Sequence, residues 1–123
     1  MAPRHRWPLL ALAFVTLALG CATSDYGRIT TKMADYEAQA ARDKGDLEAT
    51  KDTAQKIGLL NTLIRNTELQ LKIARRINPE TNPQYRSGAI NLEAARAEKA
   101  ERIKKLEDRR AEYVKRRDGL SKN

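Results

Sequence analysis

Hydrophobic positions recur at helical spacing over two long stretches of the chain. In the first stretch one position recurs every seven residues, and its members are Ile29, Tyr36, Asp43, Thr50, Ile57, Ile64 and Leu71. This spacing, with further apolar residues three or four positions away, keeps side chains on one face of a helix. The stripe weakens between Arg42 and Asp52 and broadens toward Ile77. We therefore predict a helix over about residues 25–77 with a broad buried face.

A second helix is predicted after a proline-rich interruption. Its recurring position contains Tyr85, Leu92, Lys99, Leu106, Tyr113 and Leu120. The segment 78–83 holds two prolines, each of which lacks an amide hydrogen and disfavours the α conformation in the preceding residue. Asn82 and Pro83 are suited to cap and begin the second helix, although Ser87 could begin it instead. We expect this helix to span about residues 83–118, with Gly119 in a left-handed conformation as its C-terminal cap.

Two long helices joined by a short turn pack as antiparallel neighbours. Folding the chain about residue 80 places Leu71 opposite Leu92 and Ile57 opposite Leu106. The residues predicted to pack between the helices are Ile57, Ile64, Leu71, Leu92, Ile103 and Leu106. In this arrangement residues 26–41 extend beyond the end of the second helix and lack a partner.

A break near Gly45 is the alternative to one continuous first helix. In Lys44-Gly45-Asp46, the glycine could end one helix and Asp46 could cap the next. The fold class is thus all-α: either a long helical hairpin with coiled-coil character or a small three-helix bundle, with the helical domain covering residues 26–120.

The first twenty residues have the layout of an export signal. A cationic start with Arg4 and Arg6 precedes an uncharged run from Trp7 to Leu19. As a helix this run would measure about 20 Å, which is short of the roughly 30 Å hydrocarbon core of a bilayer. It is therefore typical of a signal peptide rather than a membrane span.

The end of this signal resembles the lipobox of bacterial lipoproteins. The residues that carry the resemblance are Leu17, Ala18, Leu19, Gly20 and Cys21. The resemblance implies cleavage before Cys21 and lipidation of its thiol, with acyl chains such as palmitate, so that residues 21–25 form a short linker. In that family an aspartate just after the cysteine favours inner-membrane retention, so with Ala22 there the resemblance implies an outer-membrane position facing the periplasm. The alternative is an ordinary cleavable signal that leaves Cys21 as a free thiol.

Removal of the signal leaves about 103 residues of unusual composition. Only 17 of them are Leu, Ile, Val or Phe, whereas 54 are Ala, Glu, Lys, Leu or Arg, which is typical of long helices and coiled coils. Twenty-two basic residues face 16 acidic ones, a net charge of +6. Because Cys21 is the only cysteine, no internal disulfide can stabilise the domain.

Most of the positive charge lies in the second helix. The possible anion-binding residues are Lys104, Lys105, Arg109, Arg110, Lys115, Arg116 and Arg117. In an exported protein the relevant partners are lipopolysaccharide, lipid phosphates, acidic wall groups or acidic proteins, and not nucleic acid. The alternative is a solvated helix face, because seven acidic residues are interspersed from residue 84 onward.

Catalytic chemistry is not expected in the mature domain. The only histidine, His5, leaves with the signal, and lipidation would occupy Cys21, so nucleophile pairs with histidine cannot form. No glycine-rich phosphate loop or spaced set of metal ligands is present, and we expect neither a cofactor nor a metal.

The function predicted from these features is that of a membrane-anchored envelope lipoprotein. Its helical coiled-coil module would scaffold or tether an envelope complex, through contacts with a protein partner or with itself. The alternative is a basic helical holdase or polyanion binder that acts on unfolded envelope proteins or lipopolysaccharide.

Overall fold

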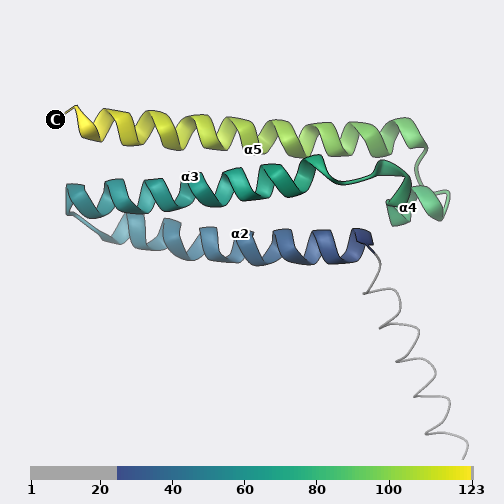
Figure 1. The fold of residues 1–123 in the computed structure, drawn as a ribbon, viewed down its shortest axis with the longest axis horizontal. Coiled ribbons are helices and arrows are strands. Elements are labelled where there is room, and N and C mark those ends of the chain that lie inside the picture. Colours follow the sequence, from purple (N-terminus) through teal and green to yellow (C-terminus); the bar gives the residue numbers. More distant parts are fainter. Residues whose placement is uncertain (1–24, 123) are drawn as a thin grey trace, which may run out of the picture.

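The computed structural model describes residues 25–122, which fold into three long helices that lie side by side (Figure 1). Helix α2 spans Asp25–Ala49, α3 spans Thr53–Arg75 and α5 spans Leu92–Ser121. Helix α3 lies between the other two and runs antiparallel to both. The all-α prediction is confirmed, in its three-helix form. Within residues 25–122 no strand is present, and no helix combines the length and apolar character needed to cross a membrane.

The break between α2 and α3 lies at residues 50–52, so the prediction of one continuous helix over 25–77 is wrong. The Thr50 amide still donates to the Asp46 carbonyl at 3.0 Å. Asp52 then caps α3, because its carboxylate accepts a hydrogen bond from the Ala54 amide at 3.1 Å. Gly45, the predicted break, lies inside α2. A helical glycine costs only about 1 kcal/mol, which tertiary packing of α2 readily offsets.

The connection between α3 and α5 contains two short helical turns of its own, η2 (Pro79–Thr81) and α4 (Pro83–Arg86). Asn82 caps α4 as predicted, since its side-chain oxygen accepts from the Gln84 amide at 2.9 Å. The Asn82 side-chain nitrogen donates to Glu98 at 3.1 Å and thereby ties the connection to α5.

Helix α4 ends after four residues, so the predicted single helix over 83–118 is also wrong. Gly88 adopts a φ of 82°, and the Ala89 amide donates back to the Gln84 carbonyl at 2.8 Å. This pairing with a left-handed glycine is the Schellman ending of a helix. Helix α5 then begins anew, because the side chain of Asn91 accepts from the Ala94 amide at 2.8 Å.

The predicted cap at Gly119 is likewise wrong, because α5 continues through it to Ser121. Gly88 is the only residue with a left-handed φ in the described part of the chain. Gly88 follows the short, proline-initiated α4, whereas Gly119 follows a long regular helix that simply continues.

Two hydrophobic clusters form the core. The first contains Ala40, Leu47, Leu60, Leu63, Ile64 and Tyr113. The second contains Met33, Leu71, Ala74, Ile77 and Leu106, with Ile103 packed against it. Each cluster draws on all three helices. Residues 26–41 are therefore not left unpartnered: Met33 is only 3% exposed, and α2 folds back onto α3.

The pairing of α3 with α5 differs from the predicted register. Leu71 clusters with Leu106 rather than Leu92, a shift of about four helical turns. Leu92 and Ile57 are only partly buried and belong to neither core cluster. The cause is the connection over residues 76–91, whose two short helices take up more chain than a simple turn about residue 80.

A buried polar layer separates the two clusters along α3. The Asn66 side chain donates to the Tyr36 carbonyl of α2 at 2.9 Å and accepts from the Gln70 side chain at 2.7 Å. Gln70 is fully buried, and its side-chain oxygen has no partner. Because a buried polar group needs its specific partner, the Asn66–Tyr36 link selects one lengthwise position of α2 on α3.

Candidate anion-binding surface and interhelical groove

The seven predicted anion-binding residues all lie on α5, but they do not point in one direction. Arg110 and Arg117 turn toward α3. Arg110 forms an ion pair with Glu68 at 2.8 Å, and Arg117 donates to the Asn61 side chain at 3.1 Å. These two guanidinium groups are thus partly satisfied within the molecule.

Within the described residues, the other five cations form neither an ion pair nor a hydrogen bond with α3. Lys105 forms an ion pair with Glu101 at 3.3 Å, beside α2. Arg116 lines a hollow with Lys56 near the α2–α3 connection. Lys104 and Lys115 are exposed, and their spacing of three helical turns places them on one line of α5. Lys104, Arg109, Lys115 and Arg116 form no ion pair or hydrogen bond within residues 25–122.

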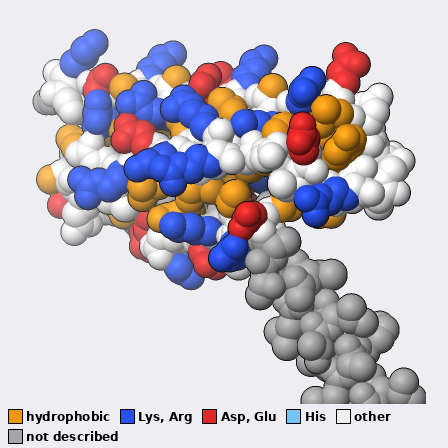
Figure 2. Space-filling view, turned by 45° about the vertical axis from the view of Figure 1, so that its right-hand side comes forward, with side chains coloured by type: hydrophobic (Ala, Val, Ile, Leu, Met, Phe, Trp, Pro, Cys, Tyr) orange, Lys and Arg blue, Asp and Glu red, His pale blue; other side chains and the backbone are white. Residues whose placement is uncertain are grey.

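The face of the bundle drawn in Figure 2 carries dispersed positive charge. Figure 2 shows Lys and Arg side chains spread along the length of the bundle, with fewer acidic side chains and small apolar areas between them. The predicted set therefore extends over several sides of α5 rather than forming one compact patch. Such a surface suits an extended anionic partner better than a single small anion.

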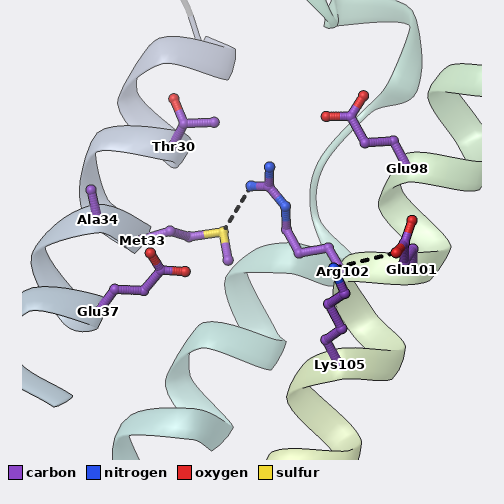
Figure 3. A pocket seen from close by; sticks show the side chains of 8 residues that line it. All are labelled: Thr30, Met33, Ala34, Glu37, Glu98, Glu101, Arg102 and Lys105. Carbon is purple, nitrogen blue, oxygen red and sulfur yellow. Dashed lines mark hydrogen bonds and ion pairs between the residues drawn. The ribbon is translucent and has the colours of Figure 1, made fainter. Parts of the chain in front are cut away.

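A groove of about 420 Å³ lies between α2 and α5, which make fewer backbone contacts with each other than either makes with α3. It is lined by Thr30, Met33, Ala34, Glu37, Glu98, Glu101, Arg102 and Lys105 (Figure 3). Arg102 reaches from α5 across the groove, and its Nη1 lies 3.7 Å from the thioether sulfur of Met33.

The groove is lined by side chains of both charges, three glutamates with Arg102 and Lys105. Its carboxylates are separated: Glu98 accepts from Asn82 and Glu101 pairs with Lys105. Within the described residues, no group of three or more acidic, histidine or cysteine side chains is close enough to hold a metal ion. The groove can instead receive a segment that has both charges and a narrow apolar face.

Sequence periodicity did not single out Arg102, Glu37 or Glu98 as groove residues. Their juxtaposition across α2 and α5 depends on the position of the α2–α3 break, which was not predicted.

Tyr113 is the titratable side chain most affected by the fold. Burial in the first cluster raises the pKa of its phenol above the usual 10.0, and the nearby guanidinium of Arg109 opposes this in part. A raised pKa means that the folded state keeps the proton longer than the unfolded chain does. The associated stability is present below pH 10 and is lost as the pH rises further.

Replacing Tyr113 by phenylalanine should therefore flatten the alkaline loss of stability. The free energy of unfolding, measured by urea denaturation at neutral pH and above pH 10, should fall more steeply in wild type than in Tyr113→Phe. Tyr85→Phe, in α4 and outside both clusters, is the matched control and should behave as wild type. Equal losses in wild type and Tyr113→Phe would contradict the assignment.

Comparison with protein-family models found no match, and neither did comparisons with curated proteins and with solved structures.

Proposed function

We propose that this protein is a lipid-anchored envelope lipoprotein whose three-helix bundle is a non-enzymatic interaction module that scaffolds or tethers an envelope complex. The observation that carries the proposal is the closeness of the bundle to the lipobox. Helix α2 begins at Asp25, four residues after Cys21. Four residues reach at most about 14 Å. Lipid on Cys21 would thus hold the bundle directly at the membrane, on our proposal the outer membrane facing the periplasm.

The surfaces that favour a binding role are the groove and the two helices that border it. Helices α2 and α5 run in the same direction on either side of the groove, with α3 beneath them. An amphipathic helix of a partner protein could lie along such a groove. Leu69, at 39%, is the one exposed large hydrophobic side chain of the described residues. Charge complementarity would therefore contribute much of the selectivity for a partner.

A second candidate function is binding of an anionic envelope polymer such as lipopolysaccharide, or of unfolded envelope proteins. The specific observation in its favour is the set of α5 cations without an intramolecular partner, Lys104, Arg109, Lys115 and Arg116. No ion pair within the described residues engages these four side chains, so they can contact a ligand.

Salt and charge reversal separate the two functions. The tethered protein is used to capture partners from a detergent extract of the envelope, at low and at moderate ionic strength. A scaffold that packs a helix in the groove should retain the same protein partner at both. A polyanion binder should lose at least about tenfold in affinity for lipopolysaccharide micelles over this range, because exposed charges are screened within about 10 Å at 0.1 M salt.

Two pairs of charge-reversal variants separate the two candidate functions further. Lys104→Glu with Lys115→Glu reverses two exposed cations on the outer side of α5, and Lys32→Glu with Lys44→Glu makes the same change of charge on α2. Weaker micelle binding in the α5 pair alone would favour the second candidate. Unchanged micelle binding with a salt-resistant protein partner would favour the scaffold. Capture of neither class of partner at either ionic strength would contradict both.

A further inference from the structure

The connection between α2 and α3 has the properties of a hinge that could straighten. It consists of residues 50–52 and contains neither glycine nor proline. Helical hydrogen bonds reach it from both sides, with the Thr50 amide bonded to the Asp46 carbonyl and the Lys56 amide to the Asp52 carbonyl, each at 3.0 Å. Only a few backbone dihedrals therefore separate the turn from an uninterrupted helix.

The sequence on either side of the hinge is compatible with such a helix. The seven-residue spacing continues through the hinge from Asp43 and Thr50 to Ile57, although the two members that precede α3 are polar. This continuity is why the sequence alone predicts a single helix over both segments. Residues 50–52 are thus compatible with two conformations, a capped turn and a continued helix.

The surface that α2 covers would be equally well filled by α2 of another copy. The contacts of α2 join residues on opposite sides of the hinge: Asn66 to the Tyr36 carbonyl at 2.9 Å, and Arg102 to Met33 at 3.7 Å. None of them involves the hinge itself. Opening the hinge would uncover Met33 and Leu47, which are 3% and 4% exposed. To be buried again, these side chains need the surface of α3 and α5 against which they now pack.

We propose that this chain also forms a domain-swapped dimer. In it, α2 and α3 of each copy join into one continuous helix through residues 50–52. The α2 segment of each copy then packs on α3 and α5 of the other, with the contacts that it makes within one chain. Exchange of an identical element is a low-cost route to dimers because the interface is already complementary. The proposal does not depend on lipidation, although a shared membrane would raise the local concentration of the two copies.

Proline at position 53 distinguishes the two states. Thr53 is the first residue of α3, where proline is well tolerated. Asp52 before it has φ −77° and ψ 122°, the extended conformation that a following proline requires. In a continuous helix the same proline would lie in the interior, where it removes a hydrogen bond and clashes with the preceding turn. Thr53→Ala is the matched control, since alanine favours the continued helix.

The test uses two differently tagged copies of the full chain, expressed together and extracted in detergent. Wild type and Thr53→Ala should retain the second tag on purification through the first, and Thr53→Pro should reduce its recovery by roughly tenfold or more. Copies that merely share a micelle or touch at the surface would be insensitive to residue 53. Equal recovery in the proline and alanine variants, or no recovery in wild type, would overturn the proposal.

A second variant covers the case in which Thr53→Pro fails to fold. A short Gly-Ser insertion after Lys51 lengthens the hinge and disfavours a continuous helix while leaving every packed residue in place. Circular dichroism shows which of the two variants keeps the helical signal of wild type. That variant should show the same loss of second-tag recovery, and undiminished recovery would reject the swap.

Discussion

Replacing Leu106 by aspartate is expected to remove a large part of the stability of the bundle and to lower its melting temperature strongly. Leu106 is 3% exposed and lies in the second cluster, where α2 contributes Met33 and α3 contributes Leu71. A carboxylate at this position would be desolvated without a partner, one of the few changes that cost more than about 4 kcal/mol. The total stability of a small domain is only about 5–15 kcal/mol, and this one has no disulfide.

Thermal melts followed by circular dichroism measure this effect. Leu71→Asp, in the same cluster at 5% exposure, should be destabilised similarly. Leu69→Asp is the matched control. Leu69 lies on α3, as Leu71 does, but is 39% exposed, so its replacement should lower the free energy of unfolding by about 0.5 kcal/mol or less. Melting of Leu106→Asp at the wild-type midpoint would show that the three helices do not share a packed core.

Replacing Cys21 by alanine is expected to abolish lipid-mediated attachment to the membrane. Cys21 lies outside the described residues, so this prediction rests on the lipobox resemblance and on the position of α2. Two or more acyl chains anchor a protein stably, since each buried methylene contributes about 0.8 kcal/mol. The described helices offer no membrane span that could replace them.

Cell fractionation together with intact mass measures the outcome. Wild type should be found in the membrane fraction at the mass of the processed, acylated chain. Cys21→Ala should be either soluble or present as precursor with its signal still attached. Thr23→Ala, two residues further on, should leave anchoring unchanged. Processed Cys21→Ala that stays in the membrane fraction as firmly as wild type would contradict the role given to Cys21.

The helical fold class was predictable because periodicity reports which face of a helix is buried. The stripe containing Ile64 and Leu71 identified the face of α3 that packs against α5, and both side chains are buried. Asn82 was predictable as a cap because its side chain acts on an amide two residues away. Features that depend on short-range chemistry of this kind can be read without knowledge of the fold.

Features that depend on tertiary geometry were less accessible. The signal for the α2–α3 break was present in Asp52, a good capping residue just before an apolar run. The seven-residue spacing, which resumes with apolar members at Ile57, and the more conspicuous Gly45 pointed elsewhere. The α3–α5 register was predicted wrongly because it depends on the conformation of residues 76–91. That segment contains two short helical turns and the left-handed Gly88, and hydrophobic periodicity does not specify how much chain they take up.

The partners of the α5 cations likewise could not be predicted from the sequence alone. The sequence placed seven cations on one helix but did not indicate that Arg110 pairs with Glu68 or that Arg117 contacts Asn61. These contacts join residues far apart in the chain and follow from the corrected register. The cations left unpartnered, such as Lys104 and Lys115, therefore became identifiable only once the helices were placed.

The most direct test of lipid anchorage is metabolic labelling of cells that express the full chain, using a palmitate analogue that carries a clickable group. The account predicts label on the processed wild-type protein and none on Cys21→Ala expressed at the same level. A wild-type protein that is exported and cleaved but carries no label would contradict it. Cys21 would then be a free thiol after an ordinary signal, and the bundle would not be held at the membrane by lipid.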